Sequence, residues 1–150
     1  MSSPSASIPK IDPETDPRFP SGKWTGFWLH RAWVGRQYMS LSLTFAQGKV
    51  VGEGCDRVGE FTISGEYDLR NGGCTLHKHY VGAHSVLYEG KNENDDQWIW
   101  GLWSIRSLDR GGFHLWPAGE DDPTGPELSA AKELVLERPR LRLEPVGGSL

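Results

Sequence analysis

The residues best suited to chemistry in this chain gather between positions 77 and 88. Three histidines, a lysine, two tyrosines and a serine fall within that short stretch: His77, Lys78, His79, Tyr80, His84, Ser85 and Tyr88. Phenol, imidazole and ammonium groups can together hold an anionic or carbonyl ligand, or transfer protons as an acid and a base. A strand that only had to fold would not need so many hydrogen-bonding side chains. We therefore interpret this stretch as the best candidate for a binding surface.

The orientation of these side chains depends on the turn in the middle of the stretch. Lys78, Tyr80, His84 and Tyr88 share even parity, and alternation along strands places such residues on one face. A tight turn at residues 81–83 can reset that parity, however. Two interpretations stay open: either the four side chains form a polar lining, or the rings pack in the core with their polar atoms in water.

A metal site is the less favoured interpretation of the histidines. His77 and His79 share one strand face, and His84 follows across the turn, which is a zinc ligand pattern in principle. No Cys or carboxylate is evidently placed to complete the ligand set. We expect a solvated strand end, with neither a metal nor a cofactor. Asp56 and Arg57, after a Gly-rich segment, are likewise interpreted as an ordinary solvated turn at a barrel mouth rather than as a gate.

Short strands are the elements that must position these groups. Apolar and polar residues alternate with period two at 37–46 and 61–67, which predicts half-buried strands. Similar segments lie at 23–30, 50–54, 74–80, 84–90, 98–105 and 113–116, and Asn71-Gly72-Gly73 is a strong hairpin signal. Eight short strands without intervening helices predict an all-β fold, an eight-stranded antiparallel up-and-down barrel whose closure removes exposed edges.

The ends of the chain differ in composition from this middle part. Residues 1–21 hold five prolines and little hydrophobicity, which predicts a disordered N-terminal arm before a barrel at 22–117. Residues 118–150 are interpreted as a linker, a short helix over 127–137 that ends before Pro139, and a tail.

Bulk properties exclude several classes of partner. A length of 150 residues fits one domain with one core. A net charge of −4 and a pI of about 5.7 argue against nucleic-acid binding, which needs a basic surface. No apolar run approaches the roughly 20 residues that cross a bilayer. The first ten residues have no apolar core, so we do not expect them to act as a secretory signal. We expect a cytoplasmic protein in which Cys55 and Cys74 are reduced.

Several short motifs, taken in order, resemble those of avidin and streptavidin barrels in the calycin superfamily. They are Gly22-Lys-Trp24, Ile63-Ser-Gly-Glu-Tyr-Asp68, and Tyr80-Val-Gly-Ala-His-Ser85 followed by Tyr88-Glu-Gly90. Trp98 to Trp103 then falls where those proteins have their seventh, Trp-containing strand. The resemblance covers roughly residues 22–105. It implies a ligand pocket at one barrel mouth, with Ser85 and Trp103 at ligand-contacting positions. Leu76 and Glu89 replace expected wall residues, which argues against biotin. A looser similarity points to a barrel domain of uncharacterised bacterial proteins and a few F-box proteins, where it recognises modified chain ends.

We therefore expect a small molecule, or a short peptide end, to bind at one barrel mouth. The predicted ligand-binding residues are Trp24 and Trp103 as apolar walls, with Lys78, Tyr80, His84, Ser85 and Tyr88 as polar groups. Two alternatives stay open. One is a cavity enzyme, a cyclase or isomerase that uses His84 or Tyr80 as acid or base. The other is a protein-interaction module with an exposed Trp surface. The outward Trp98 and Trp100 need cover, which the C-terminal helix or a second subunit in a homo-oligomer could provide.

Overall fold

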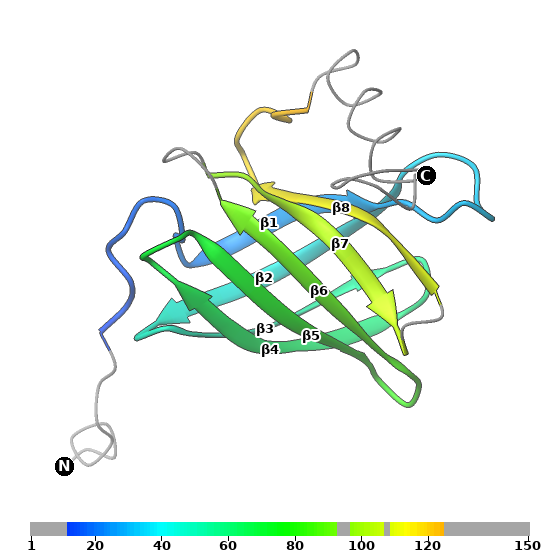
Figure 1. Ribbon diagram of the computed structural model, residues 1–150, viewed down its shortest axis with the longest axis horizontal. Coiled ribbons are helices and arrows are strands. Elements are labelled where there is room, and N and C mark those ends of the chain that lie inside the picture. The colour runs from blue at the N-terminus through cyan, green and yellow to red at the C-terminus, as the bar shows by residue number, and fades with distance from the viewer. Residues whose placement is uncertain (1–11, 93–96, 107–108, 125–150) are drawn as a thin grey trace, which may run out of the picture.

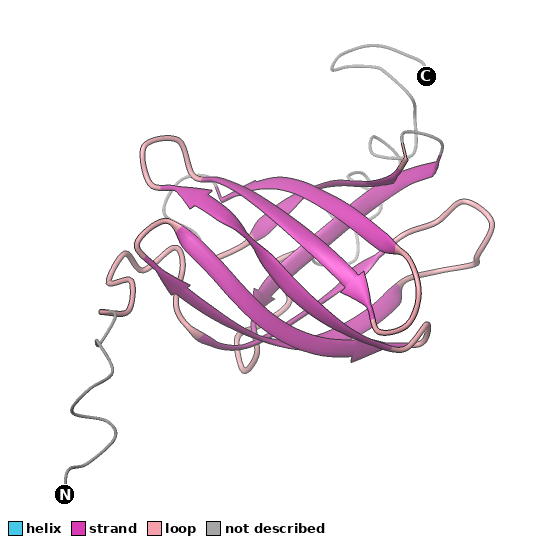
Figure 2. Ribbon diagram, turned by 90° about the horizontal axis from the view of Figure 1, so that it is seen from below, coloured by secondary structure: helices cyan, strands magenta, loops and turns pink. Residues whose placement is uncertain are grey.

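The chain forms one closed antiparallel barrel of eight strands (Figure 1). A computed structural model describes residues 12–92, 97–106 and 109–124. In chain order the strands are β1 (Gly22–Trp28), β2 (Gln37–Ala46), β3 (Lys49–Asp56), β4 (Glu60–Asp68), β5 (Gly73–Tyr80), β6 (Ser85–Asn92), β7 (Ile99–Ile105) and β8 (Asp109–Pro117). Each strand pairs with the next, and β8 pairs with β1 to close the sheet. Figure 2 shows the strands joined by loops, with no helix among the described residues. The predicted all-β up-and-down barrel is confirmed.

Two sequence predictions about the termini fall outside the described residues. These are the helix over 127–137 and the first half of the N-terminal arm, residues 1–11. Within the described part of the chain, no helix is long and apolar enough to cross a membrane.

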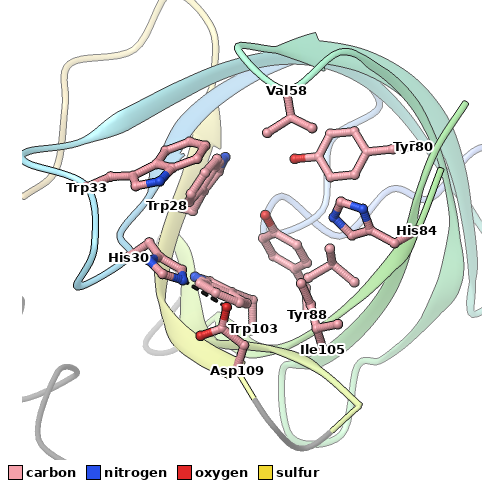
Figure 3. Close-up of a pocket in the computed structure, with 11 residues that line it drawn as sticks. Trp28, His30, Trp33, Val58, Tyr80, His84, Tyr88, Trp103, Ile105 and Asp109 are labelled. Carbon is pink, nitrogen blue, oxygen red and sulfur yellow. Dashed lines mark hydrogen bonds and ion pairs between the residues drawn. The ribbon is translucent and has the colours of Figure 1, made fainter.

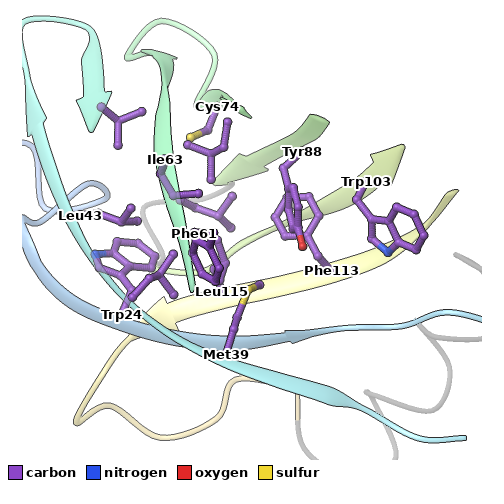
Figure 4. Packing of buried hydrophobic residues seen from close by; sticks show 14 of the residues in the cluster. Trp24, Met39, Leu43, Phe61, Ile63, Cys74, Tyr88, Trp103, Phe113 and Leu115 are labelled. Atoms are coloured by element: carbon purple, nitrogen blue, oxygen red, sulfur yellow. The ribbon is translucent and has the colours of Figure 1, made fainter. Parts of the chain in front are cut away.

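Strict alternation decides which side chains fill the barrel. Along β2, Gln37, Met39, Leu41, Leu43 and Phe45 are buried, whereas most of the residues between them are exposed. The apolar side chains of this row pack against inward residues of the other strands, among them Trp24, Phe61, Ile63, Phe113 and Leu115 (Figure 4). Leu76 belongs to the same cluster. Each such large side chain removed from water contributes roughly 1.5–3 kcal/mol to stability.

The cysteines take no part in cross-linking the barrel. Cys55 on β3 is exposed, Cys74 on β5 is buried, and both thiols are unpaired, as predicted. Strand β4 lies between their strands. Burial raises the pKa of the Cys74 thiol to about 12, so this thiol packs as an apolar side chain.

A second aromatic group lies on the outside of the barrel over β1, β7 and β8. Phe27 and Trp116 are buried together there. Trp98 and Trp100 stack on His114, at ring-centroid distances of 5.7 and 6.1 Å, and the Trp98 indole donates to His114 Nδ1 at 3.1 Å. These two tryptophans therefore face outward, as predicted, but they pack against a neighbouring strand rather than standing free.

Residues 12–20 close one end of the barrel, so the prediction of a disordered arm over 1–21 is wrong for its second half. Phe19 is completely buried, with its ring 5.4 Å from that of Phe45 and 4.9 Å from that of Tyr67. The Tyr67 hydroxyl donates to the Glu14 carboxylate at 2.6 Å, and the Trp24 indole donates to the Pro20 carbonyl at 2.9 Å. The average hydrophobicity of the segment is low, and this average does not show that its one phenylalanine is buried at the barrel end.

Removing the Phe19 ring should destabilise the whole barrel. Phe19→Ala should lower the free energy of unfolding by about 3–5 kcal/mol, because the closed end loses apolar contacts and retains a cavity. Urea denaturation followed by tryptophan fluorescence measures the change. Val34→Ala, at a fully exposed position, is the control and should change it by less than about 0.5 kcal/mol. Equal stability of the two variants would show that the segment adds nothing to the core.

Candidate binding pocket at the open barrel mouth

The opposite end of the barrel is open and holds a cavity of about 420 Å³ (Figure 3). Seven of its eleven lining residues carry an aromatic or imidazole ring: Trp28, His30, Trp33, Tyr80, His84, Tyr88 and Trp103. Val58, Val86, Ile105 and Asp109 complete the wall. The volume lies within the range of small-molecule sites, which are typically apolar clefts with a few placed polar groups.

Alternation along the strands brings the deep wall residues to this end. Trp28 and Tyr80 are the last residues of β1 and β5, and both point inward. Trp103 on β7 also points inward, as predicted, and its indole donates to the Leu29 carbonyl at 3.0 Å. Gly111 on β8 permits this position, because a Cβ there would lie 2.6 Å from Trp103 Nε1 and 2.1 Å from the Leu29 oxygen.

A buried carboxylate organises the floor of the pocket. Asp56 Oδ2 accepts hydrogen bonds from Lys78 Nζ at 2.6 Å, from the Tyr80 hydroxyl at 2.6 Å and from the Trp28 indole at 3.1 Å. Its other oxygen accepts the backbone N–H of Val58 at 2.9 Å. The side chains of Asp56 and Lys78 are 0% and 1% exposed. Their charges are therefore compensated by each other and by neutral donors, not by water.

Lys78 lies among aromatic rings just below this floor. Its Nζ donates to the Tyr88 hydroxyl at 3.1 Å and lies 3.7 Å from the Met39 sulfur. It also lies 4.3 Å from the Phe61 ring centroid and 4.7 Å from that of Tyr80, which are cation–π distances. The ammonium group is thus surrounded by partners in a site without solvent.

Burial and the ion pair shift the pKa values of this network in different directions. Desolvation lowers the pKa of Lys78 to about 8, although the Asp56 carboxylate opposes that shift. Burial alone would raise the pKa of Asp56, but hydrogen bonds from Lys78 and Tyr80 outweigh it and leave the pKa below its ordinary value. Burial and the nearby carboxylate raise the pKa of both Tyr80 and Tyr88. Near neutral pH the network therefore holds an ion pair and two neutral phenols.

The rim of the pocket carries a second polar pair. His30 Nε2 and Asp109 Oδ2 are 2.8 Å apart, and the Ala32 backbone N–H donates to His30 Nδ1 at 3.0 Å. Because Nδ1 accepts that bond, the ring proton lies on Nε2 and is donated to Asp109. The imidazole stacks on Trp103 with a centroid distance of 5.6 Å and an interplanar angle of 15°. This contact joins the β1–β2 loop to β7.

The structure brings together most, but not all, of the predicted site residues. Tyr80, His84, Tyr88 and Trp103 line the cavity, and Lys78 lies beneath its floor. Trp24 lies instead near the closed end, where residues 12–20 cover it.

Ser85 is also outside the pocket, contrary to the position that the avidin resemblance implied. Even-numbered residues stay inward across the turn, as Tyr80, Val86 and Tyr88 show, so Ser85 faces outward. Its hydroxyl bonds to His79 Nδ1 at 2.8 Å. His77 is likewise exposed on the outer face, and the described residues contain no cluster of three metal-ligating side chains.

Sequence reasoning missed part of the pocket. Trp28 and Asp56 could have been found by continuing the alternation of β1 and β3 to the strand ends. The rim residues come from loops or from the edge of a strand, where no periodicity marks them; they are His30, Trp33, Val58 and Asp109.

No protein-family model matches the chain, and no curated protein or solved structure is significantly similar to it. The closed eight-stranded antiparallel barrel is consistent with a calycin-like architecture. Because fold alone does not define function, the functional inference rests on the pocket's own chemistry.

Removing only the charge of Asp56 tests the ion pair. Asp56→Asn should lower the free energy of unfolding by about 3–5 kcal/mol, because Lys78 loses its counter-ion and must either stay buried as an unpaired cation or give up its proton. The double variant Asp56→Asn/Lys78→Met should recover part of this loss. Urea denaturation measures both. Glu66→Gln in the exposed Lys49–Glu66 pair is the matched control, with an expected change below about 1 kcal/mol. A loss at Asp56 no larger than in this control would contradict the assignment.

The lowered pKa of Lys78 also predicts a dependence of stability on pH. The pKa is about 8 in the folded state against an ordinary value of 10.5, so between pH 8 and 10 the unfolded chain binds more protons. The free energy of unfolding contributed by this group should therefore rise with pH, by at most about 1.4 kcal/mol per unit. The free energy of unfolding of the wild-type protein and of Asp56→Asn/Lys78→Met should be measured from pH 7 to 10, and the difference between the two isolates the effect. If this difference stays constant or falls as the pH rises, the prediction is contradicted.

Proposed function

We propose that the protein binds a small molecule, or the end of a short peptide, in the pocket at the open barrel mouth. The observation that carries this proposal is an aromatic-walled cavity of about 420 Å³ whose wall residues hydrogen-bond a buried ion pair behind them. Aromatic and aliphatic walls supply affinity by removing apolar ligand surface from water. The avidin-like motifs and the barrel architecture support the same proposal by analogy.

The arrangement of rings favours a flat, largely apolar ligand. Trp28 and Trp103 stand on one side of the mouth, with their ring centroids 6.2 Å apart, while Tyr80 and His84 stand on the other (Figure 3). A planar group between these walls would meet ring faces and edges on both sides, which are favourable aromatic contacts.

The alternative of a cavity enzyme has less support. The Tyr80 hydroxyl donates to Asp56, and burial with that carboxylate raises the pKa of Tyr80. Such a phenol is a poor proton donor near neutral pH, where a general acid needs a pKa close to the working pH. The interaction-module alternative relied on free outward tryptophans, but Trp98 and Trp100 stack on His114.

His84 provides a test of the pocket that spares the fold. Its ring lies at the rim, 5.1 Å from the Tyr80 ring, in an exposed turn residue. We expect the neutral dye N-phenyl-1-naphthylamine to bind saturably, and His84→Ala to weaken its binding about tenfold, equivalent to roughly 1.4 kcal/mol. Dye fluorescence measures the dissociation constant, and thermal unfolding checks the fold.

Two further measurements separate the alternatives. His77→Ala, on the outer face of β5, is the matched control and should leave dye binding unchanged. Native mass spectrometry should detect any co-purified ligand, and a binding protein should return that ligand unaltered after incubation. A chemically changed ligand would favour the cavity enzyme. A chain that binds no dye and carries no ligand would contradict the proposal.

A further inference from the structure

The hydroxyl hydrogen of Tyr88 has no partner among the described residues. A protonated lysine can only donate, so the Tyr88 oxygen is the acceptor in its 3.1 Å bond with Lys78 Nζ. The hydroxyl therefore keeps its own hydrogen for a further bond. Tyr88 lines the cavity, and Figure 3 shows its hydroxyl pointing toward the middle of the group of lining residues, so that hydrogen is directed at the bottom of the pocket.

The other buried aromatic donors of the pocket are already used. The Tyr80 hydroxyl and the Trp28 indole both donate to Asp56, at 2.6 and 3.1 Å. The Trp103 indole donates to the Leu29 carbonyl at 3.0 Å. Among these four deep donors, only Tyr88 can offer a hydrogen to a bound molecule.

The surroundings hold this hydroxyl in a fixed position. The hydrogen bond from Lys78 Nζ to the Tyr88 oxygen, at 3.1 Å, orients the hydroxyl. The Tyr88 ring packs edge-on against Phe113 at a centroid distance of 4.7 Å, inside a fully buried core. A donor held in this way is organised before the ligand arrives, which lowers the entropy lost on binding.

The charges at the floor select against an ionic group on the ligand. Asp56 already neutralises Lys78 at 2.6 Å, so a carboxylate entering the pocket would lose its hydration beside an existing carboxylate. An ammonium group would be repelled by Lys78. A neutral carbonyl oxygen accepts the Tyr88 hydrogen with a much smaller desolvation penalty.

We infer that the ligand is a flat, apolar molecule that presents an uncharged carbonyl oxygen, of a ketone or an amide, to the Tyr88 hydroxyl. This inference rests on the proposed binding function and specifies its ligand class. The aromatic walls bind the apolar body, and the single deep donor sets which end of the molecule enters first.

Three naphthalene probes of closely matched shape test the inference. They are 2-acetylnaphthalene, which has a carbonyl; 2-isopropenylnaphthalene, which has CH₂ in place of that oxygen; and 2-naphthoate, which is an anion. The wild-type protein should bind the ketone about tenfold more tightly than the alkene, the difference expected for one net hydrogen bond. The anion should bind more weakly than the ketone. Isothermal titration calorimetry measures the three affinities.

Two tyrosine variants then locate the donor. Tyr88→Phe should abolish the preference for the ketone over the alkene, whereas Tyr80→Phe should retain it, because the Tyr80 hydroxyl already donates to Asp56. The infrared carbonyl stretch of bound 2-acetylnaphthalene should shift to lower frequency in the wild type and in Tyr80→Phe, but not in Tyr88→Phe. A purely structural role of Tyr88 would not move this band selectively.

Each outcome decides the inference. Equal affinity of ketone and alkene for the wild-type protein, or tighter binding of the anion, would overturn it while leaving the proposed binding function intact. A preference that survives in Tyr88→Phe would also overturn it. If Tyr88→Phe does not fold, the wild-type affinities and the infrared band decide it alone. A wild-type protein that binds neither these probes nor the dye would overturn both proposals.

Discussion

The open end of the barrel depends on one buried ion pair. Asp56 on β3 meets Lys78 at 2.6 Å, and both side chains are excluded from water. Neither charge is tolerated there alone, so every group that solvates the pair must hold its position. The partners come from several strands: Trp28 from β1, Tyr80 from β5 and Tyr88 from β6. A single requirement, the compensation of two buried charges, thus fixes four strands at the mouth.

The two ends of the barrel have different physical roles. At the closed end, Phe19 and its neighbours fill the interior with apolar side chains. At the open end, the residues around the cavity of about 420 Å³ make fewer packing contacts than they would in a filled core, which lowers stability. The packing at the closed end can offset this lower stability, because the sheet is continuous and its strands run from one end to the other. Burial at one end therefore stabilises a cavity at the other.

The strands and the barrel were predictable from the sequence because the alternation of apolar and polar residues shows which face of each strand is buried. The same alternation predicted that Trp103 points inward, and the structure confirms this. Asp56 was misinterpreted as a solvated turn because the inward positions before it, Gly52 and Gly54, have no side chain to reveal their burial. Where glycine occupies the inward positions of a strand, no apolar side chain marks the buried face, although successive residues still alternate between the two faces.

Other parts of the site left weaker traces in the sequence. Phe19 is one apolar residue in a segment whose average composition suggests disorder. An average over a segment cannot show that one of its side chains is buried in the barrel. His30 and Trp33 belong to a loop, where position follows from tertiary contacts rather than from local periodicity. Ser85 was assigned by resemblance, whereas its odd parity with respect to Tyr88 already placed it on the outer face.

The ion pair is best understood through what it does to the pocket, since stability alone does not account for it. Well-packed apolar residues of similar volume often replace a buried ion pair without loss of stability. Such a replacement here would remove the carboxylate that accepts from Trp28 and Tyr80, and the ammonium group that donates to the Tyr88 hydroxyl. The pocket would keep its apolar rings, but Tyr88 would no longer be its single deep donor. If the pocket binds the ligand that we propose, the pair would set ligand orientation and specificity by occupying the other donors, while the aromatic walls would supply affinity, because apolar contact is strong but non-directional.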